Sequence, residues 1–267
     1  MDAAVFPDGI EPSDLDAPVW RFMPLRFFED LIRTRQLYFA RADRFDDKEE
    51  GLPPEAYVHA LGLNRFDLND IHERDHHLGG IACGRRNMYL SCWYLFGEET
   101  ASMWTRFAPD GGVAVCSTYS RLKSVVGAIP YRPHIGMVRY GGVHLTTWNV
   151  LRFMSTKRAE FAREREVRAM LWIEPWEGEG GAYHIDEFNI PRPYPVYGTL
   201  NPLGLRPTVN VKALVTGVVV SPYAPQTRKG EVEQLLAEFG YSVPIMPSSL
   251  VTGHVALPSV DDLKKYS

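Results

Sequence analysis

The stretch from Lys157 to Ile173 constrains the fold of this chain more than any other part of the sequence. It starts with helix-compatible residues and passes at Glu166 into a run typical of a β-strand. Side chains of a strand alternate between two faces. One face would therefore be apolar and suited to a core, formed by Val167, Ala169, Leu171 and Ile173.

The opposite face of this predicted strand is charged. It would carry two carboxylates and a guanidinium, from Glu164, Glu166 and Arg168, with Trp172 beside them. One interpretation is a solvent-facing strand with weak surface ion pairs. The other is a catalytic Glu-x-Glu motif at the edge of a cleft. The stretch by itself leaves both interpretations open.

The totals describe an ordinary globular chain. With 267 residues, 45% of them hydrophobic and 23% charged, it can bury a sizeable core. A net charge of −4 gives no argument for bulk binding of nucleic acid or anionic lipid. The chain shows no signal-peptide pattern and no apolar run long enough to span a membrane, and its three scattered cysteines suggest a reducing compartment. We therefore expect a cytoplasmic protein without a membrane segment.

Apolar periodicity predicts alternating strands and helices. Strands are expected at 19–23, 37–40, 88–93, 113–117, 134–140, 214–220 and 243–246. Helices are expected from Pro24 onward and at 98–108, 119–126, 147–162 and 229–239. This order predicts one α+β domain over residues 19–250, built on a mixed or antiparallel, split central sheet flanked by helices. Residues 1–18 and 251–267 would be tails, 53–87 an insertion, and 174–207 a long irregular loop of the kind that often serves in binding.

An acidic run from Asp43 to Glu50 holds five carboxylates in eight positions. Close carboxylates repel one another unless a cation lies among them. Arg41, Arg44 and Lys48 are interleaved, which favours turn and capping chemistry. The alternative is a metal-dependent nuclease or phosphoesterase, with a divalent ion held by Asp43, Asp46, Asp47 and Glu50.

Two further features have a functional and a plain interpretation. His72 and His76 are four residues apart, as in zinc-binding helices, but their segment reads His-Glu-Arg-Asp-His within an exposed insertion. Cys92 lies on a predicted buried strand, where packing is favoured over a role as a nucleophile.

Several short motifs in one order resemble a known family. They are Trp20–Met23, Leu37–Gly51, Ser91-Cys-Trp with Met103-Trp104, Ser117–Leu122, Lys157–Arg168 and Ser221-Pro222. Over roughly residues 19–250 the chain resembles the bacterial domain-of-unknown-function family 2971. This resemblance implies no general activity.

A second resemblance concerns Arg21 on the first predicted strand, Ser91 on a later one, and Glu164-x-Glu166. This order is similar to the Arg…Ser…Glu layout of ADP-ribosyltransferases. The resemblance implies that Arg21 contacts the phosphates or ribose of NAD, that the Ser91 strand supports the nicotinamide half, that Glu166 holds the nicotinamide ribose, and that Glu164 orients the acceptor. Two departures are evident: the family's Ser-Thr-Ser is Ser91-Cys92-Trp93 here, and Arg168 lies close enough to neutralise the glutamates.

The chemistry of that activity suits these residue types. Cleavage of the nicotinamide–ribose bond builds oxocarbenium character, which a carboxylate such as Glu166 would stabilise. The pyrophosphate needs cations, for which Arg21 and either Lys157 or Arg158 are candidates. Trp93 and Trp104 would sandwich the nicotinamide ring. As plainer alternatives, Arg21 pairs with the acidic run and Trp104 belongs to the core.

The sequence thus predicts an ADP-ribosyltransferase-like fold and an enzyme that uses NAD as a substrate. It would act as an ADP-ribosyltransferase or NAD glycohydrolase, with water or a protein or nucleic-acid acceptor, and without a metal. A role as a toxin or defence effector follows only by analogy with relatives of that fold. A third possibility is a non-catalytic nucleotide- or protein-binding module.

Overall fold

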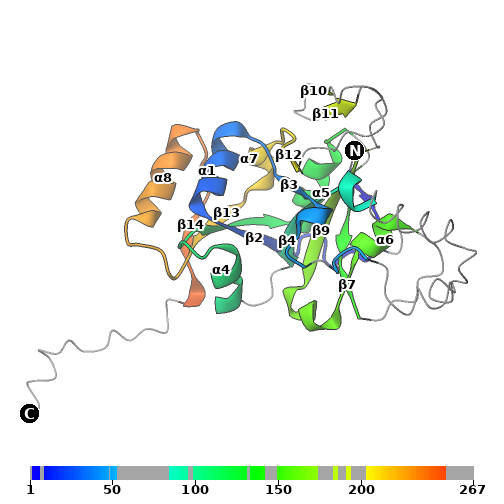
Figure 1. Ribbon diagram of the computed structural model, residues 1–267. Coiled ribbons are helices and arrows are strands. Elements are labelled where there is room, and N and C mark those ends of the chain that lie inside the picture. The colour runs from blue at the N-terminus through cyan, green and yellow to red at the C-terminus, as the bar shows by residue number, and fades with distance from the viewer. Residues whose placement is uncertain are drawn as a thin grey trace, which may run out of the picture.

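The computed structural model describes residues 2–6, 9–47, 49–52, 84–95, 99–130, 133–141, 149–173, 183–185, 191–193 and 203–250. These residues form a ten-stranded mixed sheet with helices on both faces (Figure 1). The predicted α+β class with a mixed central sheet is therefore confirmed. No helix in these ranges combines the length and the apolar character that crossing a bilayer requires.

The strands follow one another across the main sheet in a defined order. That order is β1 (Ala4–Val5), β6 (His134–Met137), β9 (Glu166–Trp172), β4 (Met88–Leu95), β2 (Pro18–Met23), β5 (Val113–Thr118), β13 (Gly217–Val220) and β14 (Ile245–Pro247). The edge pairs β1–β6 and β13–β14 are parallel and the inner pairs are antiparallel. Two small sheets pair β7 (Arg139–Tyr140) with β8 (Thr156–Lys157), and β10 (Tyr183–Ile185) with β11 (Pro191–Pro193).

The sheet forks at β4. One edge of β4 pairs with β9 along seven residues. The other edge pairs with β2 only at Leu95 and Tyr94, and with β3 (Phe39–Arg41) only at Leu90 and Tyr89. β3 continues the second branch by pairing with β12 (Gly204–Leu205). The main chain of β4 between the two branches thus lies beside a gap in the ladder.

Helices cover the two faces unequally. α1 (Leu25–Thr34), α5 (Tyr119–Gly127), α7 (Val211–Leu214) and α8 (Arg228–Glu238) pack on one face over the largest apolar cluster. α4 (Ala101–Phe107) packs on the other through Trp104, against Trp20 and Phe22. Figure 1 shows α1 and α8 side by side and α4 on its own. The face with fewer helices leaves room for a cavity.

Local chemistry explains the principal helix ends. Pro24 precedes α1, where a missing N–H costs nothing. Thr118 caps α5 by accepting the N–H of Arg121. Predicted elements that match within two residues at each end include the strands β2, β4, β5 and β9 and the helices α5 and α8.

The predicted helix at 147–162 is wrong. α6 covers only Val150–Met154, followed by β8 and a 3-10 helix, η3 (Ala159–Glu164). The hydroxyls of Ser155 and Thr156 both donate to the carbonyl of Arg152. Such side-chain bonds compete with the helical ladder and end the helix. The predicted strand at 134–140 is likewise divided into β6 and β7, and the one at 214–220 begins only after α7.

The predicted N-terminal tail also needs correction. Ala4 and Val5 form β1 on β6, because the edge of the sheet offers unpaired backbone groups. Phe6, which follows β1, is buried in an apolar cluster. Within the predicted loop 174–207, β10, β11 and β12 are strands. His72, His76 and residues 251–267 lie outside the described residues, as does most of the predicted insertion at 53–87.

Candidate functional site

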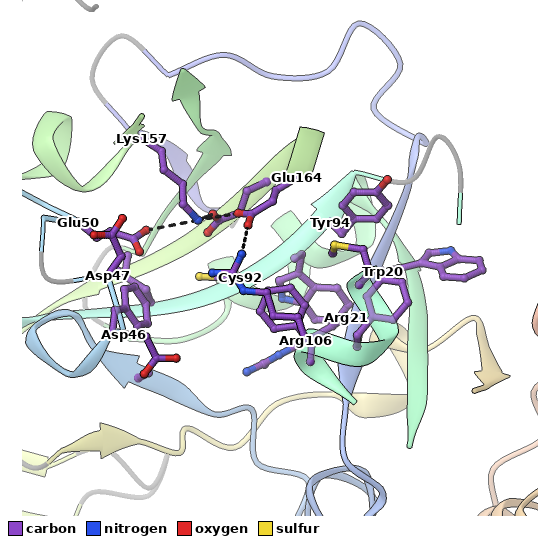
Figure 2. A pocket seen from close by; sticks show the side chains of 18 of the residues that line it. Trp20, Arg21, Asp46, Asp47, Glu50, Cys92, Tyr94, Arg106, Lys157 and Glu164 are labelled. Carbon is purple, nitrogen blue, oxygen red and sulfur yellow. Dashed lines mark hydrogen bonds and ion pairs between the residues drawn. The ribbon is translucent and has the colours of Figure 1, made fainter. Parts of the chain in front are cut away.

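A cavity of about 320 Å³ opens on the face of the sheet that carries α4. It lies beside the fork at β4, between α4 and the acidic run that follows η1 (Ala42–Arg44). Figure 2 shows its side chains converging from these elements. Its lining is rich in aromatic and charged residues: Trp20, Arg21, Phe22, Tyr38, Phe45, Asp46, Asp47, Glu50, Cys92, Trp93, Tyr94, Met103, Arg106, Phe107, Lys157, Glu164 and Glu166.

Glu164 and Glu166 reach this cavity by a route that alternation alone does not predict. Glu164 ends η3 rather than lying on β9, and Arg165 between them has a left-handed backbone with φ of 41°. This conformation is uncommon for a residue other than glycine. The turn at Arg165 brings both carboxylates to the cavity, where both pair with Lys157. The predicted placement of Glu164 on a strand face is therefore wrong, although it does line the same cavity as Glu166.

Lys157 lies among three carboxylates of the cavity wall. Its Nζ is 2.6 Å from Glu164 Oε2, 3.2 Å from Glu166 Oε2 and 3.9 Å from Glu50 Oε1. The Lys157 side chain is only 8% exposed. Figure 2 shows the ammonium between Glu50 and Glu164. Lys157 therefore compensates charge within the wall, and its predicted availability for a phosphate is reduced.

Arg168 completes this charged wall from behind. Its Nε and Nη2 donate to the two oxygens of Glu166 at 2.5 and 3.0 Å, and Nη1 donates to the carbonyl of Met154 at 2.6 Å. Nη2 also donates to Glu50. Because Arg168 is fully buried, the solvent-facing interpretation of this strand is wrong. The apolar face of the strand is confirmed, since Val167, Ala169, Leu171 and Ile173 are at most 2% exposed.

Burial controls the ionisation of Glu166 and Cys92. Removal from water raises the pKa of the Glu166 carboxyl, while the Lys157 ammonium and a bond from the Cys92 thiol oppose that rise. Burial and the neighbouring Glu166 raise the pKa of Cys92 well above its ordinary value. A protonated thiol is a poor nucleophile. Cys92 is thus better suited to donating to Glu166 than to covalent chemistry.

Arg21 lies in the fork of the sheet. Its Nη1 donates to Ser91 Oγ at 2.9 Å and its Nη2 to the carbonyl of Tyr38 at 3.1 Å. Within the described ranges no carboxylate forms a salt bridge with Arg21, so its predicted pairing with the acidic run is wrong. That run instead engages Arg41 through Asp43, Arg158 through Asp47 and Glu49, and Arg168 through Glu50.

The aromatic candidates fall in different places. Trp93 lines the cavity and donates its indole N–H to Ser91 Oγ. Trp104 is fully buried, lies edge-on to Phe22 and donates to Glu99. A sandwich of a ring between Trp93 and Trp104 is therefore wrong, because the two are at most 2% exposed and pack in different apolar clusters. The plainer alternative, that Trp104 belongs to the core, is confirmed.

Ser91 and Arg158 are not in the cavity lining. Ser91 is fully buried beneath Arg21 and Trp93 and contacts both. Arg158 is half-exposed and pairs with Asp47, Glu49 and Glu160. Ser91 therefore serves the cavity through its neighbours, and Arg158 lies outside it.

Some lining residues were absent from the sequence prediction. Arg106 donates to Glu164 Oε1 at 2.5 Å, and Met103 and Phe107 lie on the same side of α4. Their spacing of three and four residues is a signal that sequence reasoning could have used. Glu50 was considered only as part of a capped turn or as a metal ligand. Its true partner, Arg168, is 118 residues away, and no local pattern indicates it.

The proposed metal site finds no support in the described part of the chain. Asp43, Asp47 and Glu50 each engage a different arginine. No group of three or more His, Cys, Asp or Glu among the described residues is arranged to hold an ion. Asp47 instead accepts the N–H of Glu49 in a tight turn, which is the capping role predicted for this run.

Comparison with family models, with curated proteins and with solved structures gives no match to this chain. The candidate function therefore depends on the site itself.

Proposed function

We propose that this protein cleaves the nicotinamide–ribose bond of NAD, transferring ADP-ribose to a macromolecule or to water. The observation that carries the proposal is that Arg21, Glu164 and Glu166 line one cavity. They come from separate parts of the chain, and β9, β4 and β2 are consecutive neighbours in the sheet. The resemblance to the Arg…Ser…Glu layout of ADP-ribosyltransferases is consistent with this arrangement.

Arg21 is the candidate for phosphate recognition. Arg21 is a half-buried cation with no carboxylate partner among the described residues, which favours an anionic ligand, and guanidinium binds phosphate oxygens in a bidentate manner. Its bonds to Ser91 and Tyr38 fix its orientation in advance. Tyr94 beside it lines the same cavity and offers a face for an aromatic ring, whereas Trp93 is only 2% exposed and packs in the largest apolar cluster.

Glu166 is the candidate for stabilising the ribose cation. Positive charge develops on the sugar as nicotinamide departs, and a carboxylate in a poorly solvated wall stabilises it more than one in water would. A ribose hydroxyl would replace Lys157 at Glu166, where the contact of 3.2 Å is longer than the 2.6 Å contact of Lys157 with Glu164. Glu164 would face the acceptor, where Arg106 and Lys157 orient it.

The two bonds from Arg168 to Glu166 favour a second candidate, a site that binds a nucleotide without cleaving it. The positive charge of Arg168 partly neutralises the Glu166 carboxylate, whose negative charge the reaction would require. Stabilisation of the protein by NAD without release of nicotinamide would support this alternative.

The test is to incubate the protein with NAD and measure free nicotinamide by chromatography. We expect release by the wild type, and loss of at least about a hundredfold in kcat for Glu166→Gln. Glu160→Gln is a matched control, because Glu160 belongs to η3 but is 62% exposed and outside the cavity lining. No release by the folded wild type, in the presence of candidate acceptors, would refute the proposal.

A further inference from the structure

Glu50 lies at the end of the acidic run and, of the five carboxylates of the run, is the one that is buried. Its side chain is 7% exposed and bonds to Arg168, with Lys157 Nζ 3.9 Å away. A buried carboxylate is costly unless it is paired and hydrogen-bonded. Here it binds the same two cations that hold Glu166.

Arg168 has little freedom within this arrangement. All three of its guanidinium nitrogens donate: to both oxygens of Glu166, to Met154 and to Glu50. An arginine does not lose its proton in proteins, so its single charge is shared between two carboxylates. Glu50 thereby reduces the share of the positive charge of Arg168 that acts on Glu166.

The backbone next to Glu50 packs closely against Met154, which also binds Arg168. Gly51 has φ of +76°, and an added Cβ would overlap the side chain of Met154. Glycine adopts this left-handed conformation without strain and leaves room for the end of the Met154 side chain. The carbonyl of Met154 in turn accepts from Arg168. Arg168 is thus held by two segments, through Glu50 of the acidic run and through Met154 of α6.

We infer that Glu50 is a positioning residue: acting through Arg168, it orients Glu166 and leaves that carboxylate enough charge to stabilise the ribose cation. This inference rests on the proposed function. Under this inference the acidic run, through Glu50, positions Glu166 and does not bind a metal ion. Glu50 makes no bond to Glu166, and its effect is transmitted by the guanidinium that both share.

Other charged and titratable groups also face Glu166. Lys157 contacts it from β8, Cys92 donates from β4, Glu164 approaches from η3, and the Tyr140 hydroxyl on β7 accepts the backbone N–H of Glu166. Removing the charge of Glu50 leaves these groups in place. Arg168 would then pair with Glu166 alone and would stabilise its ionised form more strongly, which lowers the pKa of Glu166. The acid limb of the kcat profile, where kcat falls because Glu166 becomes protonated, would therefore move to lower pH.

The experiment compares kcat and KM for nicotinamide release from NAD, over a range of pH, in Glu50→Gln and the wild type. We expect kcat to fall about tenfold or more with KM within about twofold, because misorientation of a reacting group affects the chemical step. A purely structural role would lower the folded fraction and leave the acid limb where it is. Glu49→Gln is the matched control, since Glu49 is 65% exposed and binds Arg158.

Glu50→Gln leaves a buried cation with less compensation, so Glu50→Asp provides a second variant that keeps the charge. It should fold and show a severalfold lower kcat, with its acid limb near that of the wild type. Wild-type release with unchanged kcat in the folded Glu50 variants would overturn this inference alone. No release by the wild type would overturn the proposed function and this inference together.

Discussion

Arg21 donates to Ser91 Oγ at 2.9 Å across the fork where β2 leaves β4. The same oxygen accepts from Trp93 at 3.2 Å, so one buried hydroxyl fixes a cation and an aromatic ring of the cavity. The fork makes this contact possible, because β2 and β4 pair only at Trp20–Tyr94 and Val19–Leu95. A fully paired sheet would fill the space that the guanidinium occupies.

Replacement of Arg21 should mainly weaken NAD binding. We expect Arg21→Ala to raise KM by about tenfold to a hundredfold, the loss of one or two charge-assisted hydrogen bonds. The melting temperature should change little, because no carboxylate among the described residues loses a partner. Steady-state kinetics of nicotinamide release would measure this. A fall in kcat at unchanged KM would contradict the role assigned to Arg21, and Arg26→Ala, at an exposed position, is the control.

The acid limb of kcat should lie above the ordinary glutamate pKa of 4.5. Glu166 acts as a carboxylate, burial raises its pKa, and protonation below that pKa removes the negative charge that the ribose cation needs. Lys157→Met should move the limb to still higher pH, because the Lys157 ammonium lowers that pKa. A wild-type limb at or below 4.5 would contradict this assignment.

A separate cluster, formed by Glu99 with Trp104, Ser248 and Ser249, makes the stability of the fold depend on pH. Glu99 accepts bonds from Trp104, from Ser248 and from the N–H and hydroxyl of Ser249, and the three bonds from the two serines chiefly hold its pKa below 4.5. A lowered folded pKa gives stability that is present above the unfolded pKa and lost as pH falls through the folded value.

We therefore expect Glu99→Gln to lower the melting temperature at pH 7 and to flatten its decline between about pH 5 and pH 3. Thermal unfolding at a series of pH values would measure both effects. Glu233→Gln on α8 is the control, since Glu233 is exposed and pairs with the equally exposed Lys229. An equally steep decline in Glu99→Gln and wild type would show that the cluster does not contribute.

Two glycine substitutions should have opposite signs. A Cβ on Gly112 would collide with the Met23 carbonyl at the end of β2, so Gly112→Ala should destabilise the fold by about 1–3 kcal/mol. Gly230 is in α8 with no atom within 4 Å of an added Cβ, and Gly230→Ala should stabilise by about 0.5–1 kcal/mol. Urea unfolding measures both. A stable Gly112→Ala protein would contradict the tight packing at this turn.

The sequence predicted the elements whose pattern is local. Alternation identified the apolar face of β9, and helical spacing identified α8 almost to the residue. It failed where side chains compete with the backbone, as at Ser155 and Thr156, which end α6 early. It also failed at Arg165, because a left-handed non-glycine residue leaves no mark in the pattern.

The candidate site was predicted in part for the same reason. Glu164, Glu166 and Arg21 could be proposed from their order along the chain, and all three line the cavity. The contacts that decide their charge come from distant segments, such as Glu50 to Arg168 and Arg106 to Glu164. Trp104 was offered both for stacking and for the core, because an aromatic residue at helical spacing suits either, and the structure places it in the core.

The most direct test of the central claim is a crystal structure of the protein soaked with NAD or a non-hydrolysable analogue. We expect density in the cavity, with a phosphate on Arg21 and the nicotinamide ribose within hydrogen-bond distance of Glu166. A cavity that stays empty at saturating ligand, or a dinucleotide bound with its nicotinamide ribose away from Glu166, would contradict the account.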